Sequence, residues 1–269
     1  MTVEKFFEIF LKELSVTPTL HNYYKFLNDE KSFEFRKAYF ISRLQYIADH
    51  IKVDDAKIWD CGCGYGTTAL FLAMNGHKVY GTTLEFYFDE INSRKEFWSK
   101  YGDVNNFTVD YEDVFDNKLP NDKFDYIILQ DTLHHIEPME KSLEIFFKTL
   151  KFDGKMIVVE VNGSNIIENI KYIKQRGGFK RIIKIYDEKL QKEILLGNEN
   201  IRSWKKWKKS FLKVGFKSFE DIKYIRYYLP FSYKGRNAED MIAKENIKVT
   251  NAFLRKYFFF GLCFIAEKN

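Results

Sequence analysis

Three glycines at alternate positions, placed directly after an apolar strand and an acid, constrain this chain more than any other feature. Residues 57–66 read Lys-Ile-Trp-Asp-Cys-Gly-Cys-Gly-Tyr-Gly, and an apolar run that can start a helix follows from Thr67. Glycine has no β-carbon, so it lets a ligand approach the backbone and adopts conformations that other residues avoid. The segment therefore predicts a strand, a tight turn and a helix N-terminus whose N–H groups face an anionic group.

The glycine spacing separates two classes of cofactor. In the dinucleotide fingerprint G-x-G-x-x-G the third glycine comes one place later, where this chain has Thr67. The pattern Asp-x-Gly-x-Gly-x-Gly at 60–66 instead resembles motif I of the class I S-adenosylmethionine-dependent methyltransferases. The resemblance implies that this turn wraps the methionine part of S-adenosyl-L-methionine. The residues assigned to that part are Asp60, Gly62, Cys63, Gly64 and Gly66.

From residue 57 onward, short apolar segments alternate with helical ones. The predicted strands are 57–60, 78–82, 106–109, 126–130 and 155–161, and the predicted helices between them are 67–75, 86–100 and 139–150. This alternation predicts an α/β fold, in which a mostly parallel, doubly wound sheet carries helices on both faces. Ligands of such sheets bind beyond the carboxyl ends of the strands, where the strand order reverses.

The order of these elements also resembles the class I methyltransferases, which implies a Rossmann-like sheet of seven strands. Its last two strands, 219–228 and 257–267, would form an antiparallel hairpin. We expect residues 1–52 to form an N-terminal helical cap and residues 53–269 to form the methyltransferase domain. Within that domain, residues 163–200 are expected to be a helical lid inserted over the substrate.

Residues after the second and third strands are assigned to the adenosine part of the cofactor by resemblance. The family commonly has a ribose-binding acid where this chain has Thr83, so that role lies open between Thr83 and Glu85, which flank Leu84. The segment Gly-x-Thr-Leu at 81–84 is similar to the branch of cyclopropane fatty acid synthases and tocopherol methyltransferases. Asp113, followed by Val114, matches the acid that accepts a hydrogen bond from the adenine amino group.

The end of the fourth strand contributes candidates for the chemistry. Gln130 and Asp131 are expected beside the methionine end of the cofactor, by the same resemblance. Methyl transfer from sulfonium is an in-line displacement that needs alignment, and a base when the acceptor carries a proton. His134, His135 and Glu160 are the catalytic candidates, because histidine commonly moves protons at neutral pH. Packing against the backbone is the alternative role of His135. Four tyrosines are candidates to line the pocket: Tyr23, Tyr24, Tyr65 and Tyr87.

Composition limits the partners of the predicted methyltransferase. Residues 171–213 hold 14 lysines and arginines against four acids, which suits an anionic acceptor. The predicted acceptor is a small or medium-sized biosynthetic intermediate, such as a sugar or glycolipid, methylated on oxygen or nitrogen. A lipid-modifying enzyme that contacts a membrane surface and an RNA-binding methyltransferase remain alternatives, with nucleic acid the less favoured partner. The oligomeric state is not predicted.

Three cysteines and the lack of a visible signal peptide predict a cytoplasmic protein. The apolar run 257–266 is too short to cross a bilayer as a helix. Cys61 and Cys63 have no second pair that would complete a zinc site, so no metal is expected.

Overall fold

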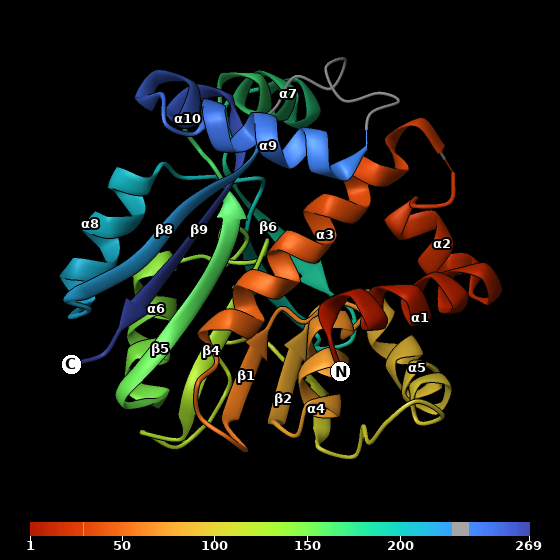
Figure 1. The fold of residues 1–269 in the computed structure, drawn as a ribbon. Helices are drawn as coiled ribbons and strands as arrows, with labels where there is room; N and C mark the ends of the chain where they lie inside the picture. The colour runs from red at the N-terminus through yellow and green to blue at the C-terminus, as the bar shows by residue number, and fades with distance from the viewer. Residues whose placement is uncertain (29, 228–236) are drawn as a thin grey trace.

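The computed structural model describes residues 1–28, 30–227 and 237–269. These residues form a seven-stranded sheet in the order β3-β2-β1-β4-β5-β9-β8 and a separate two-stranded hairpin, β6-β7 (Figure 1). The strands are β1 (Lys57–Cys61), β2 (Lys78–Thr83), β3 (Phe107–Tyr111), β4 (Phe124–Gln130), β5 (Leu150–Val161), β6 (Ile182–Asp187), β7 (Lys192–Gly197), β8 (Ser218–Tyr227) and β9 (Phe259–Glu267). The predicted α/β, Rossmann-like fold is confirmed.

Helices connect these strands and precede the first one. They are α1 (Val3–Val16), α2 (Pro18–Tyr24), α3 (Glu30–His50), α4 (Thr67–Met74), the 3-10 helix η1 (Phe86–Glu90), α5 (Ile91–Trp98), α6 (Met139–Thr149), α7 (Ile166–Arg176), α8 (Trp204–Val214), α9 (Ala238–Lys248) and α10 (Ala252–Phe258). The five strands expected between residues 57 and 161 are all present, as are the helices expected at 67–75 and 139–150. The helix expected at 86–100 is divided into the 3-10 helix η1 and α5. Among the described residues, no helix combines the length and apolarity that a bilayer crossing requires.

The topology places a ligand-binding edge at β1. Asp60 pairs with Gly81 of β2 on one side and with Ile128 of β4 on the other, and both pairings are parallel. The predicted antiparallel end of the sheet is confirmed, since β9 runs against both β5 and β8. Strand order reverses between β1 and β4, so their carboxyl ends form the switch point of the sheet.

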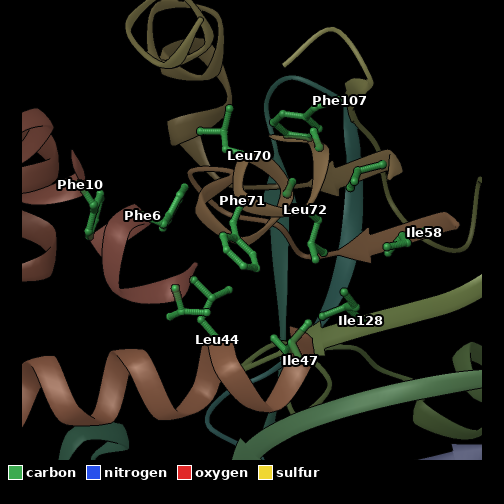
Figure 2. Close-up of a cluster of buried hydrophobic side chains, with 14 of the residues drawn as sticks. Phe6, Phe10, Leu44, Ile47, Ile58, Leu70, Phe71, Leu72, Phe107 and Ile128 are labelled. Atoms are coloured by element: carbon green, nitrogen blue, oxygen red, sulfur yellow. The ribbon is translucent and has the colours of Figure 1, made fainter. Parts of the chain in front are cut away.

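Helices cover both faces of the sheet. Successive residues of a strand point to opposite faces, so neighbouring residues of β1 enter different hydrophobic clusters. Ile58 joins a hydrophobic cluster with α1, α3 and α4, whereas Trp59 joins another with α6 and α8. Figure 2 shows the first cluster, in which Phe6 of α1 meets Phe71 of α4 edge to face at 5.3 Å between ring centroids. The helices that precede the first strand thus complete one face of the core.

Segment 163–200 differs from the helical lid that we expected. It begins with α7, but residues 182–197 form the antiparallel hairpin β6-β7. The run Ile-Ile-Lys-Ile-Tyr at 182–186 is rich in β-branched and aromatic residues, which fit a pleated strand. The abundance of lysine and arginine in this segment obscured that pattern.

The predicted bounds of the last two strands of the sheet differ slightly from the observed ones. The predicted strand 257–267 begins at Phe259, because Tyr257 and Phe258 complete α10. The predicted strand 219–228 corresponds to β8, and its last expected residue, Tyr228, lies outside the described residues. Helices α9 and α10 were not predicted.

A buried ion pair attaches α1 to the rest of the fold. Arg94 of α5 donates to both carboxylate oxygens of Glu13, at 2.9 and 2.7 Å, and Trp98 donates to the same carboxylate. The side chains of Arg94 and Glu13 are 2% and 1% exposed. A buried charge that loses its partner is strongly destabilising.

We predict that Glu13→Gln lowers the free energy of unfolding by about 3–5 kcal/mol, because it leaves the Arg94 charge uncompensated. Glu8→Gln is the matched control, since Glu8 and Lys5 form an ion pair in which both side chains are more than half exposed. Urea unfolding should show a clear loss for the first variant and no measurable change for the second. Equal losses would contradict the assigned role of the buried pair.

Candidate functional site

A cavity of about 680 Å³ opens at the carboxyl ends of β1, β2 and β4. Eleven of the twelve residues predicted to bind the cofactor line it, and they come from the ends of strands β1 to β4 and the loops that follow them. They are Asp60, Gly62, Cys63, Gly64, Thr83, Leu84, Glu85, Asp113, Val114, Gln130 and Asp131. The twelfth, Gly66, precedes α4 as its N-cap residue. The structure therefore brings the predicted cofactor residues together at the switch point of the sheet.

The three motif glycines have left-handed backbones, with φ of 78°, 54° and 72° at Gly62, Gly64 and Gly66. A β-carbon on Gly62 would lie 2.1 Å from a methyl carbon of Thr132, and one on Gly66 would lie 2.8 Å from the ring of Phe107. A β-carbon on Gly64 would meet nothing within 4 Å. Gly62 and Gly66 are therefore required for the close packing of Thr132 and Phe107, whereas Gly64 leaves its backbone open to the cavity.

Asp60 places a buried carboxyl group on the cavity wall. Its side chain is 2% exposed, and its Oδ2 has no hydrogen-bond partner among the described residues. Burial raises the pKa of Asp60 to about 7, while a hydrogen bond from the Ala69 backbone opposes this shift. Burying a carboxylate without a counter-charge is costly, so this position suits a ligand that carries a positive charge.

Thr83 and Glu85, the two residues predicted to bind the ribose, differ in how many of their hydrogen-bonding atoms are already in use. The hydroxyl oxygen of Thr83 accepts from the backbone N–H of Glu85 at 3.2 Å. The carboxylate of Glu85 has no partner among the described residues, and partial burial raises its pKa. Two carboxylate oxygens can accept from two neighbouring hydroxyls, which favours Glu85 for a diol.

The hairpin β6-β7 reaches the predicted adenine end of the cavity. Lys192 of β7 donates to the carboxylates of Asp113 and Asp116, each at 2.6 Å. Asp113 is 5% exposed, so it lies beneath this lysine. The structure thus adds a hairpin contact that the sequence did not suggest.

His134 and Glu160 are buried together and are not among the residues that line the cavity. His134 Nδ1 donates to Glu160 Oε2 at 2.5 Å, and His134 Nε2 lies 3.5 Å from Glu199 Oε2. Burial alone would lower the pKa of His134, but the carboxylates of Glu160 and Glu199 raise it to about 10. A protonated imidazole has no lone pair to accept a proton, so this geometry does not favour His134 as a general base.

His135 lines the cavity and differs from its neighbour in protonation. Its Nδ1 lies 2.8 Å from the carbonyl oxygen of Gly197, and a carbonyl only accepts, so Nδ1 carries a hydrogen. Burial and the nearby His134 lower its pKa. The neutral ring therefore keeps a lone pair on Nε2, which can take a proton or bind an ion.

Three arginines that the sequence analysis did not single out also line the cavity. Arg43 of α3 donates to the carboxylate of Asp131 at 2.6 Å. Arg36 of α3 and Arg226 of β8 line the cavity without an ion pair to any described carboxylate. They come from opposite ends of the chain, so no local motif could have identified them. The four predicted tyrosines line the cavity as well.

The lysine-rich part of 171–213 lies elsewhere. Helix α8 buries Trp207 and Phe211 against the sheet and exposes its lysines. Lys192 is occupied by two carboxylates. The positive charge available to a cavity ligand therefore comes from the arginines rather than from these lysines.

Comparison with known proteins matches the description "Methyltransferase domain" to residues 52–215. A ubiquinone biosynthesis O-methyltransferase of Rickettsia bellii is 30% identical over 126 residues, which cover 45% of this chain and 50% of that protein. A phosphoethanolamine N-methyltransferase of Triticum aestivum is 28% identical over 140 residues, covering 50% and 27% respectively. The chain thus spans about half the length, or less, of these curated relatives.

Solved structures share the fold at low sequence identity. A SAM-dependent methyltransferase from Archaeoglobus fulgidus matches with a TM-score of 0.58 and 15% identity, covering 84% of this chain and 92% of that one. Phosphoethanolamine N-methyltransferase 2 of Haemonchus contortus, in complex with S-adenosyl-L-methionine, matches with a TM-score of 0.56 and 17% identity. That match covers 84% of this chain and 52% of the other.

The raised pKa of Asp60 generates a stability prediction. The folded protein favours the protonated carboxyl group. The contribution of Asp60 to the free energy of unfolding is therefore most favourable below pH 4 and declines as the pH rises to about 7. Asp60→Asn should therefore stabilise the ligand-free protein above pH 7, by up to roughly 4 kcal/mol. Urea unfolding of both proteins from pH 4 to 8 measures this difference. A difference that does not grow with pH would contradict the buried, unpaired carboxyl group.

Proposed function

Because the chain belongs to the methyltransferase domain family, we propose that it transfers a methyl group from S-adenosyl-L-methionine to a small acceptor. The methyl group would go to an oxygen or nitrogen atom, and the acceptor would carry an anionic group. The observation that carries the proposal is the cavity at the switch point, where Gly64 leaves bare backbone and Asp60 Oδ2 is buried with no partner among the described residues.

The residues present fit this cofactor. Bound S-adenosyl-L-methionine supplies a methyl group already activated by a positively charged sulfur. The carboxyl group of Asp60 offsets positive charge, and the backbone around Gly64 accommodates the amino-acid tail. The carboxylate of Glu85, which no described residue bonds, would accept from the ribose hydroxyls. The carboxylate of Asp113 already accepts from Lys192 and from the Phe115 N–H, and its remaining lone pairs would accept from the adenine amino group.

The chain contributes mainly by positioning the reactants. An in-line displacement gains several kcal/mol of its barrier when both reactants are held in the reactive orientation. Gln130 ends β4, and Asp131 follows it. Thr68 donates to Gln130 at 2.8 Å, and Arg43 donates to the carboxylate of Asp131. These contacts fix the wall of the cavity at the end expected to hold the sulfur.

The arginines indicate the chemistry of the acceptor. The guanidinium carbon of Arg226 lies 4.6 to 4.9 Å from the ring centroids of Phe35, Phe260 and Tyr39. The Nε atom of Arg226 is buried, and no described residue bonds it. Stacked guanidinium groups retain their hydrogen-bond donors for phosphate or carboxylate. Two similar proteins, from Triticum aestivum and Haemonchus contortus, are phosphoethanolamine N-methyltransferases, and that name describes an acceptor with such a group.

We predict that Gly64→Val lowers the affinity for S-adenosyl-L-methionine at least tenfold while the protein remains folded. A β-carbon at this position meets no protein atom within 4 Å, so the larger side chain would extend into the space in which the ligand lies. Calorimetric titration with the cofactor measures the affinity, and thermal unfolding checks the fold. Gly177→Val is the matched control, because Gly177 is also left-handed, with open space around it, and lies at the end of α7. Equal affinity in the two variants would refute the assignment.

We predict that Arg226→Gln raises KM for the methyl acceptor about 10–100-fold and changes kcat little, because it removes a charge-assisted hydrogen bond. The acceptor is taken from a metabolite extract, fractionated on an anion exchanger and assayed with labelled methyl donor. Arg255→Gln is the control, since Arg255 contacts Tyr224 outside the cavity. Methyl transfer confined to unbound, uncharged fractions would contradict an anionic acceptor.

A further inference from the structure

We propose that His134, His135 and Glu199 bind a divalent transition-metal ion at the junction between the β4 loop and the hairpin β6-β7. The site lies beside the cavity, and its existence does not depend on methyl transfer. Each residue offers one ligand atom, and these three atoms lie within 4.8 Å of one another. Two imidazole nitrogens and one carboxylate oxygen form a donor set typical of zinc and of non-haem iron.

The orientation of both imidazole rings supports this assignment. The Nδ1 of His134 bonds the carboxylate of Glu160, and the Nδ1 of His135 bonds the carbonyl of Gly197. Histidines that bind metals almost always use their second nitrogen in this way, because the outer contact fixes the ring and its tautomer. His134 thereby directs Nε2 toward Glu199, and His135 is left with Nε2 as its unbonded nitrogen.

The separation of the ligand atoms also fits an ion. His134 Nε2 lies 3.5 Å from Glu199 Oε2. A direct charge-assisted hydrogen bond would be shorter, at about 2.7–2.9 Å. Two ligands bound tetrahedrally to one zinc ion at about 2.0–2.1 Å are separated by roughly 3.3 Å. The observed distance is thus closer to that of two ligands sharing an ion.

The backbone holds Glu199 against the histidines. The N–H of Gly197 donates to the carbonyl of His135 at 2.8 Å, and Ile136 forms a β-bridge with Leu196. A β-carbon on Gly197 would lie 2.1 Å from the carbonyl oxygen of His134. Because residue 197 is glycine, the end of β7 approaches the loop of His134 and His135 more closely than a side chain at this position would allow.

Acidic side chains lie on both sides of His134. Glu160 is fully buried and bonds its Nδ1, whereas Glu199 is 21% exposed and lies near both histidines. Arg176 bonds the backbone carbonyl of Glu199 rather than its carboxylate. A bound divalent ion would displace the proton that His134 carries and would lie between these carboxylates.

Zinc binding to chelator-treated full-length protein tests the proposal, without cofactor or acceptor. Calorimetry should show one equivalent of bound zinc, and zinc should raise the unfolding temperature. Glu199→Gln and His135→Gln should each weaken binding at least about tenfold. Glu193→Gln is the matched control from the same hairpin, because this exposed glutamate pairs with Lys184 and should leave binding unchanged.

Cobalt substitution identifies the ligands independently of mutagenesis. Nitrogen and oxygen ligands give visible bands without the ultraviolet charge-transfer band of a thiolate. A thiolate band would place the metal on a cysteine and overturn the proposal. Absence of stoichiometric binding, or equal binding by Glu199→Gln and the wild type, would also overturn it. Loss of methyl transfer plays no part in these readouts, so failure here leaves the proposed function intact.

Discussion

The guanidinium group of Arg94 joins three parts of the chain that are distant in sequence. It bonds the carboxylate of Glu13 in α1, the carbonyl of Tyr65 in the glycine loop and the hydroxyl of Thr67 at the start of α4. All three contacts are buried, so each partner offsets the cost of removing the charge from water. Docking of the N-terminal helices and the shape of the glycine loop are therefore coupled, which explains how helices ahead of the first strand come to form a wall of the cavity.

The loops on the other side of the cavity are held in conformations that cost free energy. Asp131 and Glu199 have φ of 53° and 51°, in the left-handed region that non-glycine residues seldom occupy. Such strain persists where surrounding contacts over-determine it, and it is concentrated at functional sites. Arg43 secures Asp131, and Gly197 brings Glu199 up to the histidine loop. Each of these two loops thus combines a left-handed residue with a charged side chain that an arginine or a histidine contacts.

Local sequence patterns were sufficient to predict features that lie within one strand and the loop after it. The glycine spacing predicted the turn after β1. Parallel strands bring their carboxyl ends to one edge, so the grouping of Asp60, Thr83 and Gln130 could be predicted from the order of the elements. The pairing of His134 with Glu199 and the approach of Arg226 depend on contacts between distant segments, which no spacing encodes. The hairpin β6-β7 was missed for a different reason: its strands lie on the surface, and their lysines resemble those of a solvated helix.

The distribution of charge around the cavity connects these features with the proposed reaction. Asp60 presents a buried carboxyl group on the β1 side, and its Oδ2 has no partner in the described part of the chain. Arg36 and Arg226 present positive charge from α3 and β8. A cationic donor and an anionic acceptor would then each be attracted to a different wall, and inside a low-dielectric cavity this attraction is stronger than in water. Because displacement at an activated methyl group depends mainly on alignment, such a polarised cavity can both select the reactants and orient them. The unfavourable burial of Asp60 is then a cost to the free protein that binding relieves.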